Sequence, residues 1–164
     1  MSNTLLFYIW GIINLLTGFW EIYAFSNRHK LQLETTTIWE KISSGKINIY
    51  NFWLEGFSEY SKVDSRYIIK PYVWLFELIN AFLSIVFMIF LMCKNYKLVK
   101  LILIISIINC IFYFLTLCIE IYVVKDKIII NNIKQYSQLW MLPIYYLISS
   151  IWIFIPSILL LCYS

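Results

Sequence analysis

The stretch VKLILIISIINCIFYFLTLCIEIYVV, residues 99–124, decides the fold class of this chain. Its charged residues are Lys100 near the start and Glu120 near the end. A run of this length and polarity is typical of a helix that crosses a lipid bilayer, which takes about 20 apolar residues. Three further runs share the pattern, over residues 5–25, 71–93 and 140–162. We therefore predict four transmembrane helices.

The composition supports this class for the whole chain. Of its residues 62% are hydrophobic and 13% are charged, and the mean hydropathy is +0.77. A soluble domain needs far more charge on its surface. We expect one all-α domain over residues 1–164, a polytopic bundle of four helices around an intramembrane cavity. The loop 26–70 mixes charges with aromatic residues, which favours short helices at the membrane interface.

Several classes of site and partner find no support in the sequence. The single histidine, His29, lies in a loop between two basic residues, so histidines cannot build a metal site. The four cysteines show no CxxC spacing, and the chain has no glycine-rich phosphate loop. The basic residues form no patch of the kind that binds nucleic acid. We predict no metal, no cofactor and no nucleic-acid partner; the bilayer is the expected surroundings.

Three glutamates, Glu21, Glu77 and Glu120, lie inside the apolar runs. A charged side chain at the centre of a transmembrane helix costs roughly 2.5–3.5 kcal/mol on insertion scales, so such residues are rare and usually functional. With alternating topology all three fall on the side of the long loop. At 1.5 Å per residue they lie roughly 6–9 Å inside that edge of the membrane.

Polar and aromatic side chains follow one helical face in each predicted span, in steps of three and four residues. The four sets are Trp10, Asn14, Thr17 and Glu21; Glu77, Asn80, Ala81 and Ser84; Ser106, Asn109, Tyr113, Thr116 and Glu120; and Tyr145, Ser149, Trp152 and Pro156. Polar side chains turn away from lipid, so these faces are expected to converge on the cavity. Carboxylates would lie at its loop end and amides deeper.

Other interpretations of these residues stay open. Buried Asn, Ser and Thr often serve only to hold helices together, at about 0.6 kcal/mol per contact. Glu120 lies near the end of its span and can reach toward the headgroups. Close carboxylates in a dry site share protons, which suits acid–base chemistry, and they equally suit binding an ammonium group. A proton or ion conduit is a third alternative, although the far end of the bundle has no matching acids.

Several segments resemble the emopamil-binding protein family. The loop segment EYSKVDSRYI, residues 59–68, is similar to that family's E-Y-x-K-x-D-S-R-Y-I motif. It leads into WLFE at 74–77, which resembles the family's helix with a glutamate. The run YFLT at 113–116 and the run WIFIP at 152–156 resemble the third and last helices. The wider group, the EXPERA domain, includes the sigma-two receptor, which binds sterols and cationic amphiphiles.

The resemblance implies a sterol Δ8–Δ7 isomerase of the endoplasmic reticulum membrane. In that family a buried acid protonates the ring double bond and a neighbouring base removes a proton from the resulting carbocation. Glu21 and Glu77 match its catalytic glutamates, and Trp152 matches the tryptophan that faces the cation, an arrangement worth roughly 0.5–2 kcal/mol. The predicted substrate-binding residues are Trp152, Thr17, Asn80, Ser149, Tyr113 and Asn109.

Two departures from the family pattern bear on catalysis. Thr17 occupies the position of a family histidine one turn before Glu21, and Ser149 occupies that of an asparagine. A threonine cannot shuttle protons near neutral pH as an imidazole does. The alternative to an isomerase is therefore a non-catalytic membrane protein that binds a sterol or another apolar or cationic amphiphile. The sequence leaves open which sterol is bound and whether the chain forms a homodimer.

Overall fold

A computed structural model of the protein describes residues 3–31, 38–49, 51–137 and 141–162, and over these ranges the regular elements are all helices. The elements are α1 (Asn3–Ser26), the 3-10 turn η1 (Arg28–Lys30), α2 (Ile38–Ser43), α3 (Phe52–Val63), α4 (Arg66–Ile69), α5 (Val73–Met92), α6 (Tyr96–Cys118), the π-helix η2 (Ile119–Val124), α7 (Lys127–Ser137) and α8 (Met141–Cys162). The all-α prediction is confirmed.

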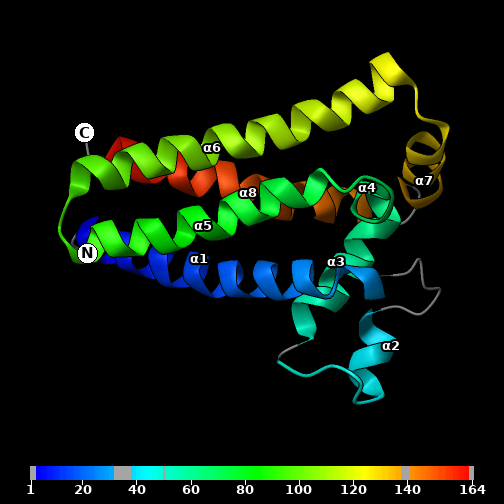
Figure 1. Ribbon diagram of the computed structural model, residues 1–164, viewed down its shortest axis with the longest axis horizontal. Coiled ribbons are helices and arrows are strands. Elements are labelled where there is room, and N and C mark those ends of the chain that lie inside the picture. Colours follow the sequence, from blue (N-terminus) through cyan, green and yellow to red (C-terminus); the bar gives the residue numbers. More distant parts are fainter. Residues whose placement is uncertain (1–2, 32–37, 50, 138–140, 163–164) are drawn as a thin grey trace.

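Four long helices, α1, α5, α6 and α8, run side by side, and both termini lie at one end of them (Figure 1). Helix α1 packs on α5, α5 packs on α6, and α6 packs on α8, whereas the contact between α1 and α8 is small. The short helices α2, α3, α4 and α7 gather at the opposite end (Figure 1).

Three of these helices are long and apolar enough to cross a membrane. They cover Leu5–Ser26, Val73–Met92 and Tyr96–Val124, in agreement with the predicted spans 5–25, 71–93 and 99–124. The fourth predicted span, 140–162, coincides with α8, whose described apolar segment is the shorter Tyr146–Leu161. Trp140 lies outside the described residues, and so does the side chain of Tyr145.

The hairpin between α5 and α6 closes through local backbone chemistry. Lys94 adopts a left-handed φ of 55°, which ends α5 and turns the chain back. Asn95 then caps α6, since its side-chain oxygen accepts a hydrogen bond from the Leu98 backbone N–H at 3.3 Å. This tight connection makes α5 and α6 antiparallel neighbours.

Two glycines of α1, Gly11 and Gly18, lie directly against α5. A Cβ on Gly18 would lie 3.2 Å from the Ala81 Cα, and a Cβ on Gly11 would lie 2.3 Å from the Met88 sulfur. Small residues at a helix contact let the backbones come together, which is the usual way that membrane helices gain packing energy. The seam places the C-terminal half of α1 directly against the N-terminal half of α5.

The segment that follows α3 is buried rather than spread over the surface. Asp64, Ser65 and Arg66 are each at most 1% exposed, and Ser61 is completely covered. Tyr67 and Trp74 join this segment to a second hydrophobic cluster with Phe57 and Leu54, separate from the cluster around Phe7 and Phe87 at the other end of the bundle. The loop end of the bundle is thus closed by a packed polar and aromatic layer.

Candidate functional site

Glu21 and Glu77 meet across the α1–α5 seam. Glu21 is 3% exposed and Glu77 is half-buried. The Glu21 carboxyl lies within hydrogen-bonding reach of the Glu77 carboxyl. Gly18, one turn before Glu21, allows the close approach of the two helices that brings these side chains together. The predicted convergence of the two carboxyl groups, the carboxyl pair, is therefore present in the structure.

The carboxyl pair has the hydrogen-bonding capacity of a proton-holding site. Ionised carboxylates can only accept hydrogen bonds, so a bond between two carboxyl groups requires a proton on one of them. The Oε2 atom of Glu21 is buried and, among the described residues, has no hydrogen-bond partner. Buried polar atoms almost always have a partner, so this oxygen is available to a water molecule or a ligand. The Glu120 Oε2 is likewise without a partner among the described residues, so this feature alone does not distinguish the pair.

The deeper amides fall into two groups. Asn80 is buried, lies within hydrogen-bonding reach of Glu21, and accepts a long hydrogen bond from the Ser106 hydroxyl at 3.5 Å. Asn109 instead donates to the Phe76 backbone carbonyl at 3.0 Å. Asn80 thus belongs to the same polar group as the carboxyl pair, whereas the Asn109 amide joins α6 to α5.

Thr17, the residue in the histidine position, is bonded to its own helix. Its hydroxyl donates to the Ile13 carbonyl at 2.6 Å and also lies 3.1 Å from the Asn14 carbonyl. The side chain is buried, one turn from Glu21. A hydroxyl whose proton is directed at the backbone is an ordinary feature of helix interiors, and this geometry provides no proton relay to Glu21.

Ser149 and Trp152 of α8 lie at different depths. Ser149 is hydrogen-bonded to the Tyr60 side chain of α3, which ties α8 to the loop end. Trp152 packs edge-on against Trp10, with 5.3 Å between the ring centroids. Eleven residues of α1 separate Trp10 from Glu21, which is about 16 Å along the helix. The Trp152 ring therefore contacts α1 at Trp10, whereas Ser149, three residues earlier on α8, contacts α3.

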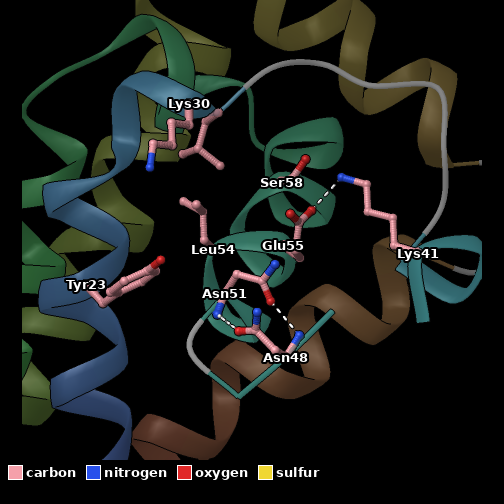
Figure 2. A pocket seen from close by; sticks show the side chains of 9 residues that line it. Tyr23, Lys30, Lys41, Asn48, Asn51, Leu54, Glu55 and Ser58 are labelled. Carbon is pink, nitrogen blue, oxygen red and sulfur yellow. Dashed lines mark hydrogen bonds and ion pairs between the residues drawn. The ribbon is translucent and has the colours of Figure 1, made fainter. Parts of the chain in front are cut away.

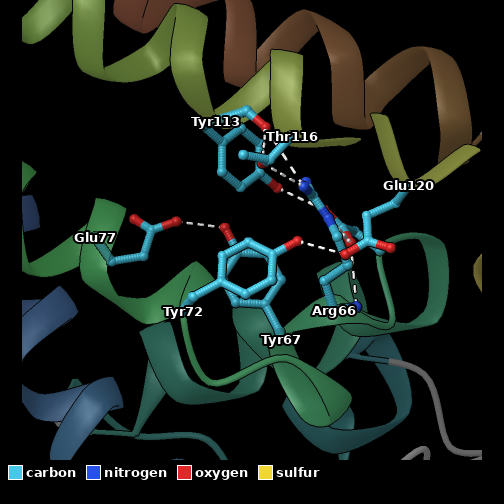
Figure 3. Close-up of polar contacts among 8 residues, drawn as sticks. Arg66, Tyr67, Tyr72, Glu77, Tyr113, Thr116 and Glu120 are labelled. Atoms are coloured by element: carbon cyan, nitrogen blue, oxygen red, sulfur yellow. Dashed lines mark hydrogen bonds and ion pairs between the residues drawn. The ribbon is translucent and has the colours of Figure 1, made fainter. Parts of the chain in front are cut away.

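A fully buried ion pair, Asp64 with Arg66, lies next to the site. We call this pair, together with the Tyr113 and Thr116 side chains that contact it, the clamp; Figure 3 shows Arg66, Tyr113 and Thr116. The Arg66 guanidinium donates to Asp64 through Nη2 at 2.6 Å and through Nε at 2.8 Å. Its Nη1 donates to the Thr116 hydroxyl at 2.8 Å, and its carbon lies 4.8 Å above the Tyr113 ring. The Tyr113 hydroxyl, a predicted substrate contact, donates to Asp64 at 2.7 Å.

Two tyrosines of the 59–68 segment reach the carboxyl pair, and both escaped the residue-level sequence analysis. The Tyr67 hydroxyl donates to Glu77 (Figure 3). The Tyr67 backbone carbonyl accepts from the Trp74 indole at 2.9 Å. Tyr60 lies close enough to Glu77 to sense its charge, and burial together with that charge raises the pKa of the Tyr60 hydroxyl. The motif had marked this segment, but its spacing could not show which side chains turn inward.

Glu120 occupies a separate position. Its Oε1 atom accepts from the Tyr72 hydroxyl at 2.8 Å and lies 3.6 Å from the Lys70 ammonium (Figure 3). It belongs to the π-helix that ends α6, a geometry in which one turn is widened. The glutamate nearest the headgroups thus interacts with the loop, and the carboxyl pair consists of the other two.

Two hollows stand out in the described structure, and neither is lined by Glu21 or Glu77. Both lie where α1 meets the segment from α2 to α3.

The chain was also compared with known proteins. Comparisons with protein-family models, with curated proteins and with solved structures gave no match. The resemblance to the emopamil-binding proteins therefore stays a prediction that rests on the motifs themselves.

Proposed function

We propose that the protein is a sterol isomerase of the emopamil-binding type, which moves a ring double bond from Δ8 to Δ7. The observation that carries the proposal is the carboxyl pair, because it supplies an acid and a base in contact inside an apolar bundle. Such a site suits a substrate that is almost entirely hydrocarbon. In this proposal α8 is the fourth span, and a cavity opens between it and α1 when substrate is bound.

The proposed reaction moves one proton in and one proton out. The protonated member of the carboxyl pair gives its proton to C9 of the C8=C9 bond, which leaves a carbocation at C8. The ionised member removes the proton from C7, and the electrons of that C–H bond form the C7=C8 bond. The pair ends with the same number of protons, and no electrons are gained or lost. General acid–base catalysis of this kind contributes typically 10²–10⁴-fold.

The hydrogen bonds favour a division of roles within the pair. A neutral tyrosine hydroxyl donates to the Glu77 Oε1, so that oxygen acts as an acceptor and suits the base. Glu21 then carries the proton and suits the acid. Trp152, which packs against Trp10, would pack along the hydrocarbon body of the substrate. This role differs from that of the cation-facing tryptophan that the resemblance implies.

A second function is favoured by the Thr17 geometry. Since the Thr17 hydroxyl is directed at the backbone of α1, the site lacks the imidazole relay of the family. The same carboxyl pair would bind the ammonium group of a cationic amphiphile without catalysing a reaction. We therefore keep amphiphile binding as the alternative function, at the same residues and in the same membrane, for which we propose the endoplasmic reticulum.

Complementation separates the two functions. The chain is expressed in a yeast strain that lacks sterol Δ8–Δ7 isomerase, and the sterols are measured by mass spectrometry. We expect Δ7 sterols with the native chain and persistent Δ8 sterols with Glu77→Gln or Glu21→Gln. The matched control is Glu120→Gln, which makes the same chemical change outside the carboxyl pair and should retain most activity.

Binding of a radiolabelled cationic amphiphile completes the test. If Δ8 sterol persists with the native chain at good expression, the isomerase proposal fails. Amphiphile binding that Glu77→Gln abolishes and Glu120→Gln preserves would then support the alternative. Equal affinity of native protein and Glu77→Gln would mean that this carboxyl does not face the ligand, and both proposals would fail.

A further inference from the structure

Two adjacent hollows at the loop end of α1 share one residue, Asn48. The first, which we call the polar pocket, has a volume of about 330 Å³ and lies between α1, α2 and α3 (Figure 2). The second, which we call the apolar groove, has a volume of about 420 Å³ and is lined by Trp20, Ile47, Ile49 and Phe52 besides Asn48. The two hollows adjoin at Asn48 and differ in chemistry, and we refer to them together as the depression.

The order of the two halves along α1 follows the polarity of a bilayer leaflet. Trp20 lines the apolar groove. Tyr23, three residues later on α1, lines the polar pocket. Lys30 lies beyond the end of α1 and lines the same pocket. A helix rises about 1.5 Å per residue, so the lining changes from apolar to polar within about 5 Å. The apolar groove lies on the side of the membrane core and the polar pocket on the side of the headgroups.

The polar pocket carries a net positive charge and several hydrogen-bond donors. Its charged lining residues are Lys30, Lys41 and Glu55, which gives one positive charge in excess. Lys41 pairs with Glu55 at 2.5 Å, and the Lys30 ammonium donates to Asn27 at 2.8 Å. Figure 2 shows the Tyr23 hydroxyl directed into the same space between α1 and α3. Ammonium and hydroxyl donors are the groups that bind phosphate oxygens.

The apolar groove is suited to a hydrocarbon chain. The rings of Trp20 and Phe52 pack at a tilt of 58°, with 6.1 Å between their centroids, and Ile49 is 69% exposed. Phe19 and Leu16 continue this apolar surface along α1 toward the membrane core, and both are more than half exposed. Aromatic residues at this level are typical of the membrane interface.

We propose that this depression binds an anionic glycerophospholipid, with its phosphate in the polar pocket and one acyl chain in the apolar groove. The excess positive charge favours an anionic over a zwitterionic headgroup. A free phosphate compound would occupy the polar pocket alone and would leave the apolar groove unfilled. The site is separate from the carboxyl pair.

Native mass spectrometry of the purified, delipidated full chain in detergent tests the headgroup half. The probes are phosphatidylglycerol, phosphatidylcholine with the same acyl chains, and glycerol 3-phosphate. We expect phosphatidylglycerol to bind at least about fivefold more tightly than phosphatidylcholine, since one basic residue near a headgroup contributes about that factor. Lys30→Gln should remove most of this preference and Lys30→Arg should retain it. The control Lys97→Gln, at the start of α6, should leave it unchanged.

Two substitutions in the apolar groove test whether it binds the acyl chain. Ile49→Ser and Phe52→Ser should each lower the affinity for both lipids several-fold, while the preference for the anionic headgroup persists. Circular dichroism of each variant verifies that the helices are intact. Equal binding of phosphatidylcholine and phosphatidylglycerol would overturn the headgroup assignment. Competition by glycerol 3-phosphate as strong as by the lipid would overturn the lipid itself. A Lys30→Gln variant that is folded and keeps the full preference would also overturn the proposal.

Discussion

The clamp and the carboxyl pair are two buried charged groups at the same end of one bundle, and they are built on opposite principles. In the clamp an acid faces a base, and Asp64 accepts from both Arg66 and Tyr113. In the carboxyl pair an acid faces an acid, and the Glu21 Oε2 has no partner among the described residues. One group has its polar atoms bonded within the protein, whereas the other keeps an oxygen available.

The clamp therefore has the bonding expected of a group that stabilises the fold, and the carboxyl pair has the bonding expected of a functional group. A buried ion pair with good geometry resists the loss of either partner, because the remaining charge is left uncompensated. Two neighbouring carboxyls disfavour the folded state, and sequences keep such costs mainly at functional sites. Tyr67 connects the two groups: it follows Arg66 in the chain and donates to Glu77.

The largest effect on stability should come from breaking the clamp. Arg66 is completely buried, and removing one partner of a buried ion pair costs about 3–5 kcal/mol. We expect Arg66→Met to lower the free energy of unfolding by about that amount, measured by denaturant titration of the purified protein in detergent micelles.

The double variant Asp64→Leu with Arg66→Met is the control for charge. Replacing both partners removes the uncompensated carboxylate, so the double variant should be more stable than Arg66→Met alone. A double variant that is less stable than Arg66→Met would show that the clamp acts through packing and not through charge compensation.

The α1–α5 seam should give the next largest effect. A Cβ on Gly18 would lie 3.2 Å from the Ala81 backbone, and larger side chains would force the helices apart. Overpacking typically costs about 1–3 kcal/mol. We expect Gly18→Leu to lose that much stability and also to separate the carboxyl pair, which a loss of amphiphile binding would report.

Gly56 is the matched control glycine. It lies within α3, and a Cβ added there meets nothing within 4 Å. Gly56→Ala should therefore keep stability and binding, and it should gain slightly from helix propensity. If Gly18→Leu were as stable and as active as Gly56→Ala, the seam would not control the distance between Glu21 and Glu77.

The sequence predicted the helices and the membrane-facing pattern well, because both depend on local properties. Long apolar runs mark spans, and the spacing of Glu21, Glu77 and Asn80 on their helical faces predicted that they meet. These inferences required only the helical repeat and the cost of polar groups in lipid.

The clamp and the inward tyrosines could not be predicted in this way. Asp64 and Arg66 lie in a segment that reads as an interfacial loop, and their burial depends on a tertiary contact with Tyr113, 47 positions beyond Arg66 along the chain. Likewise, Tyr113 lies on the polar face of its helix, but its hydroxyl is used by Asp64. The role of Trp152 that the resemblance implies, facing the cation, stays a prediction.

A partly exposed pair at the surface, Lys70 with Asp126, provides the third and smallest case; its side chains are 28% and 16% exposed. Lys70 donates to Asp126 at 3.1 Å, and this hydrogen bond holds the pKa of the Asp126 carboxyl below its usual range. The same bond raises the pKa of Lys70, where Glu120 adds to the effect. Exposed pairs are screened by water and salt, so their contribution to stability is modest.

The sign of the pH dependence follows from these shifts. Because the folded-state pKa of Asp126 is lower than the unfolded value of 3.8, its contribution is present above that value and is lost as the pH falls through the folded pKa. The thermal midpoint of the native protein should therefore drop more between pH 5 and pH 3, a window of about two units around that value, than the midpoint of Asp126→Asn. For Lys70 the contribution is lost instead as the pH rises above its raised pKa, so Lys70→Gln should differ from the native protein below that pH. Parallel curves for the native protein and Asp126→Asn would mean that water screens the pair completely, and that burial is what separates it from the clamp.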